Sequence, residues 1–316
     1  MSLARRRSPR VATSRKANIR RRFQWLPLWL MLPSVVIVLV IVGYPLVDLF
    51  ETSFQRYGLF QLFDHKPTWD GLTNYDQILT NSAFWVAVER TVLFTLACVG
   101  GTMVIGMLVA LMLTRLGRAM RGAVSIVMVL AWAMPPVSAV IVWQWLFANQ
   151  FGVVDWILTA LHLGNFSNLD WFGVSSFRAW FVITLMVIWQ AVPFVALSLY
   201  AGLSQVPREL YEAARVDGAG ALVVFKSITM RMLRPIISLL VILSVIWDFN
   251  LFTQIWVMTS GGPNGGTTTI GIWSYEEAFV SSNFGLGAAA SVIAMVLVGI
   301  MSFYYIRHLI GTGEVA

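Results

Sequence analysis

Six long apolar runs constrain the fold of this chain more than any other feature of its sequence. They cover about residues 26–50, 91–114, 123–147, 179–203, 236–258 and 286–306. Runs of about 20 apolar residues match the roughly 30 Å of hydrocarbon that a transmembrane helix has to cross. A β-barrel would instead show segments of about ten residues with alternating hydrophobicity. The chain is therefore predicted to be an all-α membrane protein with six transmembrane helices.

Basic residues lie mostly on one side of these runs. Of the 22 Lys and Arg residues, nine precede the first run, three lie between the second and third, five lie between the fourth and fifth, and one follows the sixth. Because cytoplasmic loops are rich in Lys and Arg, both termini are predicted to be cytoplasmic. We expect a basic tail over residues 1–24, a membrane domain over 25–310 and a C-terminal tail over 311–316. The N-terminal tail fits contact with anionic lipid rather than with nucleic acid.

The sequence shows no pattern of a catalytic, metal or nucleotide site. His65, His162 and His308 lie far apart, and a Gly-x-Ser-x-Gly motif is absent. Lys226-Ser227 lacks the glycine that precedes the lysine of a phosphate-binding loop. We therefore expect a chain that is not an enzyme, has no cofactor or metal and does not bind ATP by itself.

Polar residues inside the fifth run are candidates for a transport pathway. Asp248 lies near its middle, and Ser244 shares its helix face, while Asn250 and Gln254 share another. A carboxylate at mid-bilayer costs about 2.5–3.5 kcal/mol on insertion scales, so it is expected to face protein or water. The alternative is a structural role in hydrogen bonds between helices.

Prolines mark the third and fourth runs at similar positions. Trp132 precedes Pro135 and Pro136, and Gln190 precedes Pro193. A proline inside a helix can kink it and free backbone carbonyls. Both runs are therefore expected to be broken or kinked beside polar and aromatic side chains, which suit either a transport pathway or core packing.

Two segments predicted to lie outside the membrane have recognisable patterns. Residues 148–178 contain apolar positions that suit a short interfacial helix ended by Gly164. Residues 259–285 carry TSGGPNGGTTT, which predicts turns.

The cytoplasmic segment 204–235 combines charge with glycine. Pro207 suits the first position of a helix, and Gly218 suits its left-handed end. A second helix is expected over 221–234, before Pro235 and the fifth span. The segment predicts a rigid helical protrusion at the membrane surface to which another protein can bind. An ordinary amphipathic loop remains an alternative. Its charged and small residues available for contact are Glu212, Ala213, Ala214, Arg215 and Asp217.

The stretch ELYEAARVDGAG, followed by FKSITMRMLRPII, resembles the EAA signature of permease subunits in bacterial ABC importers. Glu212, Ala213, Ala214, Gly218 and Pro235 occupy the positions of that signature, although the end reads MLRP where many members have LP. FGVVDWILTALHLG, MTSGGP and NFGLGAAAS resemble further segments of the carbohydrate-uptake class. The resemblance covers roughly residues 25–310. Within this class, the sequence most resembles maltose- and trehalose-type first permease subunits.

This resemblance implies a type I importer permease fold in the bacterial inner membrane and a set of partners. These are a second permease subunit, two ATPase subunits that bind ATP and Mg, and an extracytoplasmic sugar-binding protein. Residues 212–218 would form a coupling helix that sits in a cleft of the ATPase and drives alternating access. The substrate would be a sugar such as the disaccharides trehalose or maltose. Residues near the corresponding sugar site are Trp132, Gln190, Phe194, Ser244 and Asp248, with Asn250 as a further candidate from the helix pattern.

Two other functions remain alternatives at this point. A proton-coupled transporter would use Asp248 as its proton site and work without an ATPase. A membrane scaffold would use the loop at 204–235 only to dock a partner.

Overall fold

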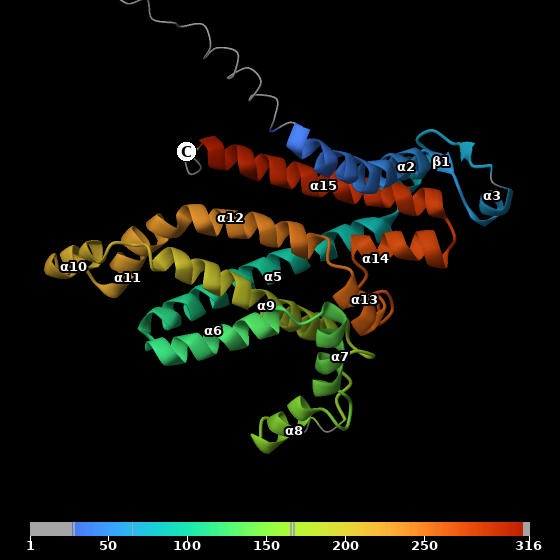
Figure 1. Cartoon of the computed structure of the whole chain (residues 1–316). Helices are drawn as coiled ribbons and strands as arrows, with labels where there is room; N and C mark the ends of the chain where they lie inside the picture. Colours follow the sequence, from blue (N-terminus) through green and yellow to red (C-terminus); the bar gives the residue numbers. More distant parts are fainter. Residues whose placement is uncertain (1–26, 28, 65, 165, 167, 312–316) are drawn as a thin grey trace, which may run out of the picture. The chain divides into compact units, whose positions relative to one another are not determined.

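The computed structural model describes residues 27, 29–64, 66–164, 166 and 168–311 (Figure 1). The tail predicted at 1–24, and residues 312–316 of the tail predicted at 311–316, lie outside these residues. The chain divides into two units, residues 1–51 and 52–316. The described part of the first unit is an apolar helix that runs over Trp29–Ser53 and so ends at the start of the second unit. It contains the π-helical segment η1 (Leu39–Gly43), followed by α2 (Tyr44–Ser53).

The second unit holds the remaining elements. In chain order they are β1 (Gln55–Arg56), α3 (Leu59–Asp64), β2 (Thr68–Trp69), α4 (Thr73–Thr80), α5 (Ser82–Arg115), α6 (Arg118–Trp132), α7 (Pro136–Leu146), α8 (Val153–Ala160), α9 (Ser176–Leu203), α10 (Arg208–Val216), α11 (Ala221–Val224), η2 (Phe225–Thr229), α12 (Met230–Phe249), α13 (Thr253–Thr259), α14 (Ile270–Tyr275), η3 (Glu276–Val280) and α15 (Phe284–Gly311). The two short strands pair antiparallel, with Gln55 opposite Trp69 and Arg56 opposite Thr68.

The number of spans agrees with the sequence prediction. Among the described residues, five helices are long and apolar enough to cross a membrane, and a sixth span results if α6 and α7 are counted as one. These two helices meet at an angle of 100°. The break lies at Met134 and Pro135, as the prolines predicted, because Pro136 starts α7 and the residue before a proline is disfavoured in a helix.

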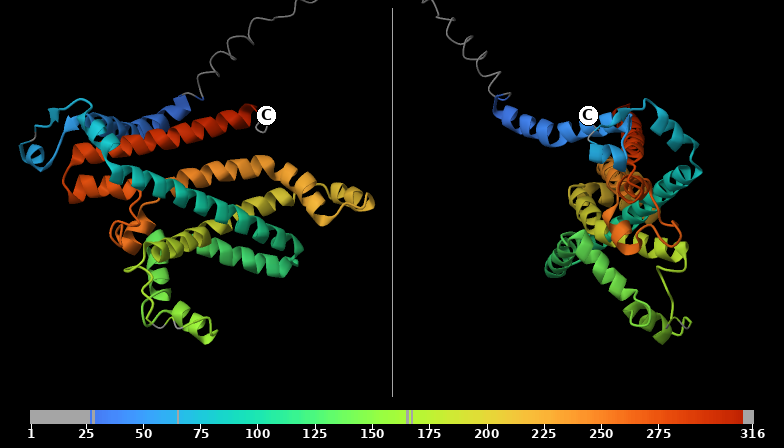
Figure 2. Two further views of the ribbon diagram at one scale, coloured as in Figure 1. Left: turned by 180° about the vertical axis from the view of Figure 1, so that it is seen from behind. Right: turned by 90° about the vertical axis from the view of Figure 1, so that its right-hand side faces the viewer.

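Helices α5 and α9 form the centre of the second unit. They pack along each other, with α6 and α12 against them, while α10 lies at one end of this group and α7 and α13 lie at the other (Figures 1 and 2). Two groups of buried apolar side chains line the contact. One joins α5 and α9 to α7 and α13, and the other joins α5 and α9 to α12. The first half of α9 therefore packs with α7 and α13, and its second half packs with α12.

A small residue allows the close approach of α5 and α9. A Cβ atom added at Gly106 would lie 2.7 Å from Cγ1 of Val195. Helices in membranes commonly pack through such small residues because lipid tails offer no hydrophobic driving force for helix association.

We expect Gly106→Leu to lower the thermal stability of the detergent-solubilised protein, because overpacking a core typically costs about 1–3 kcal/mol. Gly100→Leu is the matched control, since a Cβ at Gly100 on the same helix meets nothing within 4 Å. Equal melting temperatures of the two variants would contradict the packing argument.

The fifth apolar run differs from its prediction at both ends. In place of a separate helix over 221–234 and a span over 236–258, one helix covers Ala221–Phe249 through α11, η2 and α12. Pro235 lies inside this helix, where it removes one backbone donor without ending the helix. The helix stops at Asn250, whose side-chain Nδ2 donates to the carbonyl of Ile246 at 2.8 Å. Because α13 is a separate helix, the expectation that Asn250 and Gln254 share a helix face is wrong.

The outer segment after α7 also differs in extent. The interfacial helix predicted to end at Gly164 is the shorter α8, with Leu161 as its C-cap. Gly164 has a positive φ of 145°, but His162 already has a positive φ of 56° and turns the chain earlier.

Candidate functional site

A cavity between α6, α7, α9, α12 and α13 gathers most of the residues predicted for a transport pathway. Its volume is about 170 Å³. The side chains that line it include Trp132, Gln190, Phe194, Ser244 and Asp248. Five side chains from helices far apart in the sequence thus meet in one place. Asn250 is not among them and lines another pocket between α14 and α15, with Ser274 and Ser291.

Aromatic rings form part of the cavity wall. The rings of Trp132 and Phe194 stack with centroids 5.8 Å apart and an interplanar angle of 19°. The ring of Trp247 lies 5.5 Å from that of Phe194 at 59°. Trp132 and Trp247 remain 46% and 50% exposed, so their faces are available for contact.

Asp248 brings a buried carboxylate to this aromatic wall. Asp248 and Ser244 lie one turn apart on α12, and each is only 6% exposed. Within the described part of the chain, Oδ2 of Asp248 is buried and has no hydrogen-bond partner. A carboxylate oxygen accepts hydrogen bonds, and leaving it unpaired away from water is costly. The cavity therefore suits a ligand that donates hydrogen bonds, such as one with hydroxyl groups.

Gln190 has a structural contact as well as a place in the cavity. Its Nε2 donates to the carbonyl of Met134 at 3.0 Å, at the break between α6 and α7. The carbonyl of Met134 lies in the break before α7, and Gln190 gives it a hydrogen-bond donor there. Gln190 therefore makes a hydrogen bond between helices of this chain, and its role in a transport pathway stays a prediction.

Two further side chains lie beside the residues predicted for the sugar site. They are Trp247, one of the deep tryptophans that suit either stacking on a sugar ring or core packing, and Gln254, which the sequence pattern placed on a face with Asn250. Both line the cavity, Gln254 because the break after Phe249 turns α13 back toward it. A polar residue just after the end of an apolar helix was the available signal for Gln254.

Helix α10 presents the charged loop as predicted. Pro207 directly precedes the helix, and Gly218 has a φ of 71°. The N–H of Ala219 donates to the carbonyl of Ala214 at 2.9 Å, and the N–H of Gly218 to that of Arg215 at 3.1 Å. This is a Schellman motif, which ends a helix sharply. The contact residues of α10 and its end stand exposed apart from Ala214, which is half-buried; the exposed ones are Glu212, Ala213, Arg215, Asp217 and Gly218.

One side of α10 is tied to the membrane domain. The hydroxyl of Tyr211 lies 3.2 Å from Oγ1 of Thr229 in η2. Glu212 and Val216, with Val216 88% exposed, lie on the side away from this contact. The helix is therefore attached on one face and free for a partner on the other.

Side chains from two helices hold the glycine-rich turn predicted at 259–285, and a side chain from a third helix holds α13 just before it. Arg90 of α5 donates to the carbonyl of Gly265, and Nε1 of Trp180 of α9 to that of Gly266 at 2.9 Å. Nε2 of Gln144 of α7 donates to the carbonyl of Val257 at 3.0 Å. Beyond the turn, burial and the neighbouring Glu277 raise the pKa of Glu276 above its usual range. Hydrogen bonds from α5, α7 and α9 thus connect α13 and the turn after it to the rest of the membrane domain.

Metal ligands do not cluster in the described residues. Among them, no group of three or more His, Cys, Asp or Glu side chains is arranged to hold a metal ion. The lone cysteine, Cys98, is buried in the core beside Phe94.

Comparison with known families decides the identity of the fold. A family model described as a binding-protein-dependent transport system inner membrane component matches residues 102–312. The match includes both the cavity and α10, and it covers about two thirds of the chain. The chain belongs to this family. It is an inner-membrane, multi-pass permease, as predicted, and a transport component rather than an enzyme.

Several curated proteins are similar to this permease over most of its length. It is 41% identical over 281 residues to the diacetylchitobiose uptake system permease protein DasB of Streptomyces coelicolor, covering 89% of this chain and 85% of DasB. It is 32% identical to the trehalose/maltose transport system permease protein MalF of Thermococcus litoralis, over 88% of this chain and 91% of MalF. The resemblance to permeases of carbohydrate ABC importers found in the sequence is confirmed.

A solved structure has the same fold. It is the crystal structure of a bacterial ABC transporter involved in the import of the acidic polysaccharide alginate, with a TM-score of 0.77 and 19% sequence identity. The alignment covers 92% of this permease and 96% of that chain. The prediction of an ABC importer permease fold is therefore confirmed.

Proposed function

We propose that this permease carries a neutral disaccharide through the cavity around Asp248, as one of two membrane subunits of an ATP-driven importer. The observation that carries the proposal is the buried Oδ2 of Asp248, without a partner in the described structure, beside the stacked rings of Trp132 and Phe194. Sugar hydroxyls donate hydrogen bonds to a carboxylate, and the apolar faces of sugar rings stack on aromatic side chains.

The choice of a disaccharide rests on the named relatives. DasB is a diacetylchitobiose permease, and MalF of Thermococcus litoralis is a trehalose/maltose permease. The carboxylate of Asp248 adds a further argument, because it would repel an acidic sugar. We therefore place diacetylchitobiose beside trehalose and maltose as candidate substrates.

Energy for transport would come from two ATPase subunits, one of which binds α10. Its free face offers Glu212 and the exposed Val216, and the Schellman motif at Gly218 keeps the helix end in one conformation. A second permease subunit would complete the pathway, and an extracytoplasmic binding protein would deliver the sugar. Dependence on an ATPase separates this function from the proton-coupled alternative.

Transport by the reconstituted complex tests the proposal. The permease, its partner permease, the ATPase and the binding protein are placed in liposomes and supplied with trehalose, maltose, diacetylchitobiose and single sugars. We expect ATP-dependent uptake of at least one disaccharide. Uptake driven by a proton gradient without the ATPase, or no uptake of any sugar, would contradict it.

A further inference from the structure

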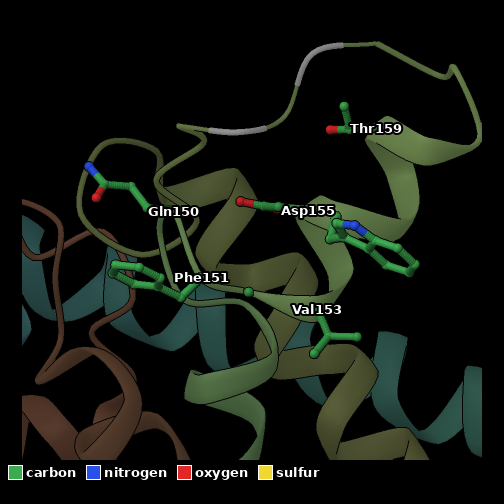
Figure 3. A pocket seen from close by; sticks show the side chains of 7 residues that line it. Gln150, Phe151, Val153, Asp155 and Thr159 are labelled. Carbon is green, nitrogen blue, oxygen red and sulfur yellow. The ribbon is translucent and has the colours of Figure 1, made fainter.

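A second pocket lies at α8, away from the transport cavity. Its volume is about 400 Å³, and it is lined by Gln150, Phe151, Gly152, Val153, Asp155, Trp156 and Thr159 (Figure 3). None of these residues lines the cavity around Asp248. The pocket is in the segment predicted to lie outside the membrane, and its volume is within the range of about 300–1,000 Å³ that small-molecule sites occupy.

Asp155 is the central polar group of this pocket. It is only 3% exposed, and its Oδ1 accepts a hydrogen bond from Nε1 of Trp171 at 2.7 Å. The ring of Trp171 packs edge-on against Phe147, with centroids 5.1 Å apart. The side chain of Asp155 is therefore held in one orientation by buried aromatic residues of the core.

The other carboxylate oxygen of Asp155 has no partner. Oδ2 is buried and makes no hydrogen bond to any residue that the structure describes. In Figure 3 the carboxyl group points toward the side of the pocket where Gln150 lies. A buried acceptor of this kind gains most from a ligand that brings a hydrogen-bond donor.

Exposed aromatic side chains and neutral polar groups complete the pocket. Phe151 is 78% exposed and Trp156 is 71% exposed, so both rings are open to contact in this chain. Gln150 and Thr159 add neutral polar groups beside them. A carboxylate, an amide and a hydroxyl next to open aromatic faces match a ring with hydroxyl groups on its edge and apolar C–H groups on its face.

We propose that the α8 pocket is an accessory binding site for a neutral sugar unit, outside the transport cavity. One sugar hydroxyl donates to Oδ2 of Asp155, and the sugar ring stacks on Trp156. The choice of ligand rests on the proposed function, but the site itself rests on the geometry of Asp155. Such a site would hold sugar at the outer face of the permease independently of the cavity.

Sugar binding by the assembled importer in nanodiscs, without binding protein or ATP, tests this proposal. Saturation-transfer NMR is recorded with trehalose and with diacetylchitobiose. The permease carries Gln190→Ala and Asp248→Ala, which weaken the transport cavity. We expect sugar binding to persist in this background and to fall at least about fivefold on adding Asp155→Asn. That change keeps the side-chain volume and an acceptor for Trp171, but it replaces the unpaired acceptor by a donor.

Trp156→Ala provides a second variant, and Leu161→Ala provides its control. Trp156→Ala should weaken binding to a similar extent because it removes the stacking surface. Leu161 is 63% exposed just after α8 but does not line the pocket, so its variant should bind as before. Melting temperatures of all variants establish that they are folded.

Two outcomes would overturn the proposal: no residual sugar binding with Asp155 intact, or sugar binding that Asp155→Asn leaves unchanged. Failure of the proposed function is distinguishable, because it appears as absent ATP-driven uptake by the wild-type complex, whereas this test reads binding alone.

Discussion

Glu212→Ala is expected to reduce ATP-driven sugar uptake about tenfold or more while the permease still inserts into the membrane. Glu212 is exposed and takes no part in the Tyr211–Thr229 contact, so its loss would remove the proposed partner contact without removing that contact of the fold. Central interface residues commonly contribute about 2 kcal/mol or more, which corresponds to more than a tenfold change in affinity. Uptake and sugar-stimulated ATP hydrolysis in proteoliposomes measure the effect.

Two further variants sharpen this prediction. Glu209→Gln removes the same charge one turn before Glu212, on the same helix face, and measures how far along α10 the proposed partner contact extends. Gly218→Val should impair coupling, because valine disfavours the φ of 71° although a Cβ there meets nothing within 4 Å. Normal uptake and normal stimulated ATP hydrolysis in both Glu212→Ala and Gly218→Val would refute the coupling role of α10.

Asp248→Ala is expected to abolish most sugar uptake, again by about tenfold or more. Hydrogen bonds to charged groups contribute about 1.5–3 kcal/mol, and the variant removes the acceptor proposed for the sugar hydroxyls. The protein itself should not be destabilised, because the change removes a buried carboxylate oxygen that lacks a partner in the described structure. Loss of uptake with an unchanged or higher melting temperature would therefore indicate a defect in transport and not in folding.

Asn250→Ala is the informative comparison for Asp248. The amide of Asn250 caps the end of α12 and lines the pocket between α14 and α15 instead of the aromatic cavity. We expect uptake by this variant to stay within about threefold of wild type, since the change removes a single neutral hydrogen bond. Full uptake by Asp248→Ala would exclude Asp248 from the pathway, and an equal loss in both variants would extend the pathway to the second pocket.

The sequence predicted the spans and the charged loop because both depend on local physics. An apolar run long enough to cross a bilayer has few alternatives to a helix, and Pro207 and Gly218 mark the ends of α10 through their own backbone preferences. The pairing of Ser244 with Asp248 was also predictable, since residues four apart share a helix face. Each of these features required only neighbouring residues.

The break after Phe249 was not predictable in this way. Residues 251–258 continue the apolar composition of the fifth run, so hydropathy placed its end at 258 although α12 ends at Phe249. The break arises where the side chain of Asn250 bonds to the carbonyl of Ile246, a contact that competes with the helix. The contact between Gln190 and Met134, and the place of Gln254 in the cavity, depend on helices far apart in the sequence.

The continuous helix from Ala221 to Phe249 would act as a lever between α10 and the cavity. Its 29 residues start just after α10, and its other end carries Ser244 and Asp248. At 1.5 Å per residue this helix is about 40 Å long, so tilting a rigid helix of that length by one degree about the end next to α10 would displace the far end by about 0.7 Å. η2 and Pro235 interrupt the regular hydrogen-bonding of this helix, and both lie between α10 and Ser244. A movement of α10 would therefore reach the cavity carboxylate only through these two interruptions.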